Sequence, residues 1–384
     1  MPTYDVIVLG TGGVGSAAMF HLAKRGAKVL GLDRFPPGHD RGSSHGRTRI
    51  IRQAYFEHPD YVPLLKRAYE LWDDLSQRCG KQLYHEIGLL QIGPPDGQVV
   101  PGVLESARRH GLNVDHLTAA NARERFPGFR VADNWEAVFE RSAGYLDVES
   151  CVLAHVAESQ RLGAEVRSGA VVHRWDAGGG EVSVTTSAGQ FHAAKLILAV
   201  GPWASEFLRE IGIKVEVYRK DVYWYPVDEA CMRADHGCPA YLYERDARHL
   251  MGVWYGIPEV DDWGFKIAEH TNAPYNFPIQ DPMSARREIR DGWRQETEAV
   301  LSALLPWVGR PLLHHSVCFY TMSPDENFIV DLHPRHPQVA FAAGLSGHGF
   351  KFTCVLGEIL ADLALSGRTD HPIGFLNCRR FGTV

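Results

Sequence analysis

The stretch Tyr4-Asp5-Val6-Ile7-Val8-Leu9-Gly10-Thr11-Gly12-Gly13-Val14-Gly15 decides the fold of this chain. The apolar run over residues 4–9 predicts a buried strand, the glycines predict a tight turn, and residues 16–25 predict a helix that ends at Gly26. A second apolar run over residues 28–32 leads to Asp33, about twenty residues beyond the glycines. This order is typical of the βαβ unit that binds a dinucleotide.

Each part of this unit has a chemical purpose. Gly10 permits the tight turn, Gly12 lets the backbone approach a pyrophosphate, and Gly15 permits close packing of the helix on the strand. The start of the helix offers unpaired N–H groups and a partial positive charge to the phosphates. Asp33 can accept hydrogen bonds from both ribose hydroxyls. The pattern alone leaves NAD and FAD open, because both carry the same ADP half.

Length and composition narrow the class of protein. The 384 residues predict two or three domains at about 100 to 200 residues each. The net charge of -6 gives no net basic field, so we expect no nucleic-acid partner. No apolar run reaches about 18 residues, and residues 1–5 lack the basic start of a signal peptide. We therefore expect a cytoplasmic protein with no membrane partner, and the end over residues 381–384 carries no peroxisomal address.

The cysteines and histidines argue against a structural metal or disulfide framework. The seven cysteines are scattered and form no Cys-x-x-Cys pair, and the 19 histidines form no His-Glu-x-x-His array. We expect no metal site.

Strand patterns from both ends of the chain predict a discontinuous cofactor domain. Residues 195–200 form a continuous apolar run of the buried parallel kind, and residues 339–343 form another, followed by a glycine turn and a helix. This second turn offers another set of backbone N–H groups, although an ordinary βα loop would look the same. Residues 215–226 alternate with a period of two and predict an antiparallel sheet outside the cofactor domain.

Five further segments carry a resemblance to a known family. They are residues 44–52 (SHGRTRIIR), 61–64 (YVPL), 318–321 (CFYT), 325–334 (DENFIVDLHP) and 344–351 (GLSGHGFK). In order and spacing they resemble the monomeric sarcosine oxidase and N-methyltryptophan oxidase family of flavoenzymes. The resemblance implies FAD, attached covalently through a cysteine thioether to the flavin 8α carbon. The matching cysteine is Cys318, which would otherwise be read as a buried core thiol.

The resemblance also implies a fold class and a division into domains. The class is α/β, with a discontinuous Rossmann-like FAD-binding domain and an inserted α+β substrate domain on a largely antiparallel sheet. The expected FAD-binding domain takes residues 1–83, 145–214 and 318–384. The expected substrate domain takes residues 84–144 and 215–317.

Site roles follow from the same matches. Arg52 and Lys351 match the pair that binds the substrate carboxylate, for which a guanidinium fork and a point charge are suited. Lys266 matches the lysine that activates O2, because a fixed cation stabilises negative charge developing on oxygen. Arg49 and His45 match residues packed against the flavin.

Tyr255 and His270 match residues that line the substrate cavity. The segment over residues 347–349 matches the flavin pyrimidine edge. The expected cofactor contacts are Gly10, Gly12, Gly13, Val14, Gly15, Asp33, Arg34, Ser44, His45, Thr48, Arg49, Val172, Gly201, Trp203, Gly347, His348, Gly349, Phe350 and Lys351.

The implied reaction is oxidation of a secondary amine, most simply an N-methyl α-amino acid. The product imine hydrolyses to an amino acid and an aldehyde, and O2 is reduced to hydrogen peroxide. Residues 242–254 are longer and bulkier than the sarcosine oxidase pattern, so a cyclic imino acid such as pipecolate, or a fructosyl amino acid, stays open as the substrate. The family implies a monomer.

Two other classes of function compete with this one. A nicotinamide-dependent dehydrogenase would explain the first glycine turn but gives Cys318, Lys351 and the second turn no role. A flavoprotein scaffold without chemistry would not need Arg52 and Lys266.

Overall fold

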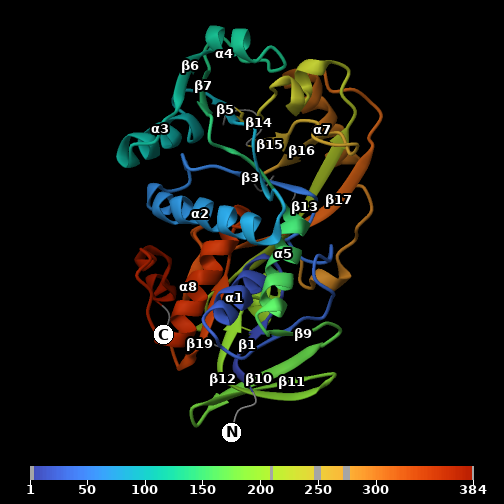
Figure 1. Ribbon diagram of the computed structural model, residues 1–384. Coiled ribbons are helices and arrows are strands. Elements are labelled where there is room, and N and C mark those ends of the chain that lie inside the picture. The colour runs from blue at the N-terminus through green and yellow to red at the C-terminus, as the bar shows by residue number, and fades with distance from the viewer. Residues whose placement is uncertain (1–3, 208–210, 246–251, 271–276, 383–384) are drawn as a thin grey trace.

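The computed structural model describes residues 4–207, 211–245, 252–270 and 277–382. Its elements form three sheets with helices packed between and around them (Figure 1). The N-terminal unit is as the glycine motif predicts: β1 (Tyr4–Leu9), α1 (Gly13–Lys24) and β2 (Val29–Leu32), with β1 and β2 parallel. The helix begins at Gly13, three residues before the expected start, because the last three residues of the motif already have helical geometry.

The first sheet combines strands from distant parts of the sequence. Its central strand β12 (Gly189–Leu198) runs parallel to β1 and to β19, as the apolar run over residues 195–200 predicts. The first half of β12 instead pairs antiparallel with β11, so the strand is longer than expected. The other strands are β9 (Glu165–Arg167), β10 (Val172–Gly178), β11 (Glu181–Thr186), β18 (Ile329–His333) and β19 (His336–Ala343).

Alternate residues of this sheet fill two separate cores. Val6 and Val8 face a core shared with α1, α2 (Val62–Cys79), α5 (Val148–Arg161) and α8 (Thr353–Ser366). Ile7 and Leu9 face the opposite side, in a second core that also contains Val182 and Val184 of β11. In Figure 1 α1 lies between α5 and α8. A Cβ at Gly357 of α8 would lie 2.5 Å from the Ala17 Cβ of α1, so glycine there allows the two helices to touch.

The second sheet is antiparallel except for the β5–β14 pair. Its strand order is β17-β13-β16-β15-β14-β5-β7-β6. The bounds are β5 (Leu89–Gly93), β6 (Asp115–Thr118), β7 (Glu136–Glu140), β13 (Glu216–Tyr225), β14 (Ala240–Glu244), β15 (Val253–Ile257), β16 (Phe265–Glu269) and β17 (His314–Met322). Three helices, α3 (Val99–His110), α4 (Ala119–Arg125) and α7 (Asp291–Leu304), accompany it in the upper part of Figure 1. The expected boundary between residues 317 and 318 falls inside β17, all of whose residues pair with β13.

A third, smaller sheet has three strands. It contains β3 (Thr48–Ile51), β8 (Gly144–Asp147) and β4 (Tyr84–Glu86). β3 carries Arg49 and leads to Arg52, so this short strand supplies two of the predicted site residues. The remaining short helix, α6 (Ala204–Phe207), follows β12.

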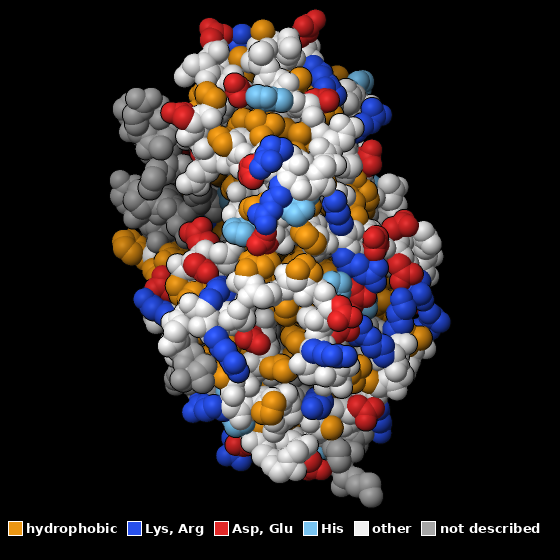
Figure 2. All heavy atoms as spheres, turned by 90° about the vertical axis from the view of Figure 1, so that its left-hand side faces the viewer, with side chains coloured by type: hydrophobic (Ala, Val, Ile, Leu, Met, Phe, Trp, Pro, Cys, Tyr) orange, Lys and Arg blue, Asp and Glu red, His pale blue; other side chains and the backbone are white. Residues whose placement is uncertain are grey.

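The described surface mixes charges of both signs. On the face shown in Figure 2, Lys and Arg side chains are interspersed with Asp and Glu. In the part of the chain that the structure describes, no helix combines the length and the apolar character needed to cross a membrane.

Candidate functional site

The first glycine turn forms one wall of an open cleft. Gly10 has a φ of +87°, and a Cβ there would lie 2.4 Å from the Ala199 carbonyl oxygen. A Cβ at Gly15 would lie 1.7 Å from the Gly10 carbonyl oxygen. Both positions therefore require glycine, as the motif predicts. The cleft has a volume of about 730 Å³, and six further predicted contacts line it: Gly12, Asp33, Arg34, Val172, Gly201 and Trp203.

Asp33 is oriented by the turn itself. Its Oδ2 accepts hydrogen bonds from the Thr11 backbone N–H at 2.7 Å and from the Thr11 hydroxyl at 3.1 Å. Its Oδ1 accepts from the Phe35 N–H at 2.9 Å. The carboxylate is thus fixed at the end of β2, with further lone pairs available to ribose hydroxyls.

A second cavity continues from this cleft toward β17. Its volume is about 760 Å³, and its lining comes from both glycine turns, from the loop before β3 and from β17. The predicted residues in this lining are Gly13, Val14, Ser44, Arg49, Gly201, Cys318, Gly347, Gly349 and Phe350. Ala199 and Gly201 belong to both linings, so the two spaces adjoin, as an extended dinucleotide needs. We call the second cavity, which both glycine turns line, the cofactor cavity.

Two buried hydroxyls in the cofactor cavity provide a test of fit. Thr321 and Thr353 line it, and among the described residues their hydroxyl oxygens have no hydrogen-bond partner. Thr353 begins α8, and its methyl carbon would lie 2.8 Å from a Cβ at Gly13. A buried hydroxyl without a partner is costly, and a phosphate or flavin oxygen would satisfy it. The residues present therefore fit a dinucleotide.

Cys318 lies in the lining of the cofactor cavity. It is 3% exposed, and it is the one cysteine in the described lining of the cofactor cavity. The Arg49 Nη2 lies 3.2 Å from its sulfur, and the thiol donates to the Ser43 carbonyl at 3.6 Å. The sulfur therefore faces the cofactor cavity next to the guanidinium of Arg49.

A third space, the substrate cavity, adjoins the cofactor cavity. It has a volume of about 480 Å³ and shares four lining residues with the cofactor cavity: Arg49, Tyr320, Gly347 and Phe350. The predicted residues Arg52, Tyr255, His270, His348 and Lys351 complete its lining together with Ile50, Glu57 and Leu242. A small molecule here would touch a cofactor in the neighbouring cavity.

Two buried cations face the substrate cavity. Arg52 is 3% exposed, and its Nη2 donates to both carboxylate oxygens of Glu57, at 2.7 and 2.8 Å. The Lys351 Nζ donates to the His348 carbonyl at 2.8 Å. Burial, reinforced by repulsion from Arg52, lowers the pKa of Lys351 to about 7. Burial disfavours the charged form of Lys351, and a substrate carboxylate beside it would favour that form.

Glu57 was not predicted from the sequence, and it occupies the fork of Arg52. Burial would raise the pKa of this carboxyl, but Arg52, His348 and Lys351 together lower it to about 2. Glu57 is therefore ionised and competes for Arg52 with any carboxylate that enters. The only sequence signal was an acidic residue five positions after a buried arginine, which is too common to predict a contact.

Aromatic and imidazole groups also line the substrate cavity. Tyr320, also missed from the sequence, contacts the His270 Nδ1 through its hydroxyl at 3.1 Å and is hydrogen-bonded to Tyr255. Its signal was its place two residues after Cys318, on the same face of β17. Burial lowers the pKa of His270 to about 3, so its imidazole is neutral at pH 7.

Two predicted residues, Lys266 and His45, are absent from the described cavity linings. Lys266 is 1% exposed and absent from the described linings; its Nζ donates to the Gly46 carbonyl at 2.8 Å and to the Thr48 carbonyl at 2.6 Å. Lys266 is on β16 and thus contacts the backbone of residues 46–48, the segment that leads to Arg49. His45 is also buried, and the Ser316 hydroxyl lies 3.4 Å from its Nδ1. Burial, with the nearby Arg49, lowers the pKa of His45 to about 3.

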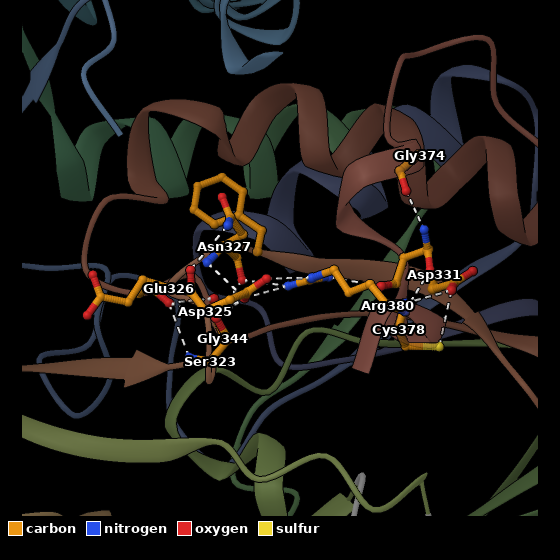
Figure 3. Close-up of polar contacts among 12 residues, drawn as sticks. Ser323, Asp325, Glu326, Asn327, Asp331, Gly344, Gly374, Cys378 and Arg380 are labelled. Atoms are coloured by element: carbon orange, nitrogen blue, oxygen red, sulfur yellow. Dashed lines mark hydrogen bonds and ion pairs between the residues drawn. The ribbon is translucent and has the colours of Figure 1, made fainter. Parts of the chain in front are cut away.

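An outer cavity of about 1150 Å³ leads to the substrate cavity, with which it shares Glu57, His270 and His348. Its lining includes residues 325–327, whose turn is hydrogen-bonded to the C-terminal segment (Figure 3). Arg380 donates to both oxygens of Asp325, at 2.8 and 3.0 Å. Six of the residues 242–254 expected to shape the pocket, 246–251, lie outside the described residues.

Comparison with known proteins agrees with this geometry. The model of the family "FAD dependent oxidoreductase" matches residues 5–363. A monomeric sarcosine oxidase of Streptomyces avermitilis is 38% identical over 100% of this chain and 99% of its own length. An N-methyl-L-tryptophan oxidase of Yersinia pestis is 35% identical over 98% of this chain and 99% of its own length.

A solved structure of NikD, titled an unusual amino acid oxidase, is similar with a TM-score of 0.85 and 26% identity, covering 98% of both chains. The glycine turns, the cofactor cavity and the family match over 359 of 384 positions (from residues 5–363) lead to one conclusion. The chain belongs to the family of FAD-dependent oxidoreductases that includes monomeric sarcosine oxidase and N-methyltryptophan oxidase.

Proposed function

We propose that this protein is an FAD-dependent oxidase of secondary α-amino acids, of which N-methyl amino acids are the simplest. The observation that carries the proposal is the pair of buried cations, Arg52 and Lys351, in a cavity that shares a wall with the cofactor cavity. A carboxylate bound by this pair would hold the carbon beside the amine nitrogen next to the flavin. When bound, FAD supplies the electron chemistry: it accepts a hydride equivalent from that carbon, and O2 takes the two electrons to give hydrogen peroxide.

The protein residues supply binding and a suitable environment for the amine. The neutral His270 and the protonated Tyr255 and Tyr320 carry no negative charge that would stabilise an ammonium, and burial beside them disfavours a charged group, so they favour an uncharged amine. Loss of hydride from that carbon needs the nitrogen lone pair, which an uncharged amine retains. Water then hydrolyses the released imine to a primary amine and an aldehyde.

We further propose that the flavin is joined to Cys318 by an 8α-thioether and that the protein is a monomer. The position of the thiol in the cofactor cavity, beside Arg49, supports the link. The name of the sarcosine oxidase relatives supports the monomer. The division into domains expected from the sequence stays a proposal, with all of β17 assigned to the substrate side because of its pairing with β13.

A panel of amines tests the proposed activity. The purified holoenzyme is mixed without O2 with sarcosine, other N-methyl amino acids, pipecolate, proline and a fructosyl amino acid, and loss of flavin absorbance is recorded, followed by peroxide release in air. Reduction by the N-methyl amino acids is expected. Reduction by a cyclic imino acid or a fructosyl amino acid alone would select one of the alternative substrates, and no reduction by any member would contradict the proposal.

Replacing Arg52 by alanine should weaken substrate binding strongly. A charged hydrogen bond contributes about 1.5 to 3 kcal/mol, which corresponds to a KM increase of roughly 10- to 150-fold for the best amino acid in the panel. Glu57 loses its partner in this variant, so Arg52→Ala/Glu57→Gln is the matched control for the uncompensated carboxylate. An unchanged KM in both variants would remove Arg52 from the carboxylate site.

Carboxylate binding should weaken as the pH rises. A lysine with a lowered pKa is charged below that pKa, and binding of an anion raises it, so affinity is full below about pH 7 and falls above it. Acetate, which carries no titrating amine, is the probe, and its dissociation constant is read from the flavin spectrum between pH 6 and pH 9. In the steep range this dissociation constant should rise roughly tenfold per pH unit. Lys351→Met should bind acetate weakly with no such slope; a slope that persists in this variant would assign it to another group.

A further inference from the structure

A buried ion pair lies outside all the cavities described above. The Lys220 Nζ is 2.9 Å from the Glu269 Oε2, and the two side chains are 2% and 7% exposed. Lys220 is on β13 and Glu269 ends β16. Such a pair adds little net stability, because taking two charges out of water costs about as much as their attraction returns. Stability alone therefore gives no reason for charges at these two positions.

The lysine of this pair reaches the aromatic wall of the site. Lys220 pairs directly with Cys318 in the antiparallel register of β13 and β17, so the two side chains share one face of the sheet. Tyr320 lies two residues further on that face, and the Lys220 Nζ is 5.1 Å from the centroid of its ring. An ammonium at this distance is attracted to the ring face. Lys220 therefore makes a cation–π contact with the ring of Tyr320.

The glutamate is the sequence neighbour of the other partner in the same contact. Glu269 immediately precedes His270, whose backbone N–H donates to the Val253 carbonyl at 2.6 Å. The His270 Nδ1 is 3.1 Å from the Tyr320 hydroxyl. The ion pair thus connects the strand segment that carries His270 with the ring of Tyr320, and these two residues touch each other in the wall of the substrate cavity.

We propose that the Lys220–Glu269 ion pair is a positioning element for amine oxidation. It fixes Tyr320 against His270 at the wall that the cofactor cavity and the substrate cavity share. The inference rests on the proposed function, because it assigns the pair a role in that reaction. A displacement of about 1 Å at reacting groups can slow a reaction about hundredfold. An ion pair that restrains the positions of Tyr320 and His270 would therefore increase the rate of amine oxidation.

The test removes both charges together. Lys220→Met alone would leave Glu269 as an uncompensated buried charge and could unfold the chain, whereas Lys220→Met/Glu269→Gln leaves none. The full-length holoenzyme of this double variant is assayed with the best amino acid of the panel. We expect kcat to fall roughly ten- to hundredfold. We also expect the change in the flavin spectrum on adding acetate to differ from that of the parent.

A second background separates positioning from general destabilisation. Tyr320→Phe removes the hydroxyl that contacts His270. If the pair acts through Tyr320, the double substitution should have much less effect on kcat in the Tyr320→Phe background than in the parent, because coupled residues are non-additive. Arg67→Met/Glu358→Gln, which removes an ion pair between α2 and α8, is the matched control and should leave kcat within about twofold.

Three outcomes would overturn the inference: an unchanged kcat in the double variant, an equal loss in both backgrounds, or an equal loss in the Arg67→Met/Glu358→Gln control. Failure of the proposed function looks different, because the parent holoenzyme itself would then show no reduction by any amine. In that case the acetate-induced spectrum still decides whether the pair positions Tyr320. Identical acetate spectra in the parent and the double variant would count against it.

Discussion

Cys318→Ser should abolish covalent attachment of the flavin. When the parent protein is precipitated with acid, we expect the yellow colour to stay in the pellet, and in Cys318→Ser we expect it to move completely to the supernatant. The reason is chemical: a serine hydroxyl is a much weaker nucleophile than a cysteine sulfur and cannot form a thioether. The Arg49 Nη2 lies 3.2 Å from the sulfur, and the thiol is in the wall of the cofactor cavity.

Cys354→Ser is the matched control for this result. Cys354 is equally buried, but it lies in the helical core, and burial raises the pKa of its thiol well above the usual value. Its replacement should leave all the colour in the pellet. Colour in the supernatant of the parent would remove the covalent link while keeping a flavoprotein, and colour in the pellet of Cys318→Ser would assign the link to another residue.

Lys266→Met should slow the reaction with O2 without slowing reduction by substrate. A fixed cation near developing negative charge on oxygen contributes roughly a hundred- to thousandfold in rate. The Lys266 Nζ is 5.3 Å from the centroid of the Trp224 ring and donates to backbone carbonyls of the segment that leads to Arg49. Lys266 is not among the described residues that line the substrate cavity. The two half-reactions are measured separately in a stopped-flow instrument, one without O2 and one with the pre-reduced enzyme.

The pH dependence of this step gives a second readout. Burial, reinforced by repulsion from Arg49, lowers the pKa of Lys266 well below its ordinary value. A base with a lowered pKa is cationic only below that pKa, so the O2 rate of the parent should decrease as the pH rises through it, and the rate of Lys266→Met should be independent of this ionisation. Equal O2 rates in the parent and the variant at low pH would exclude the role.

Much of the fold was predictable because local patterns determine it. The first glycine motif requires glycine for steric reasons at Gly10 and Gly15, and the apolar runs of β1 and β12 have the length and composition of buried parallel strands. The sequence also predicts that strands near both ends meet in one sheet, which the pairing of β12 with β1 and β19 confirms. The expected ends of helices and strands differed from the observed ends by a few residues. The apolar pattern does not show where a strand changes its pairing partner, as β12 does between β11 and β1.

The sequence by itself determined the cofactor motif and, through the family resemblance, the class of chemistry. Only the tertiary structure decided which charges meet. Glu57 at Arg52, Tyr320 at His270 and the Lys220–Glu269 pair depend on contacts between segments or on side-chain direction, which no local pattern encodes. The pKa values of Lys351 and His270 likewise arise from burial, which exists only once the strands and loops have closed around them.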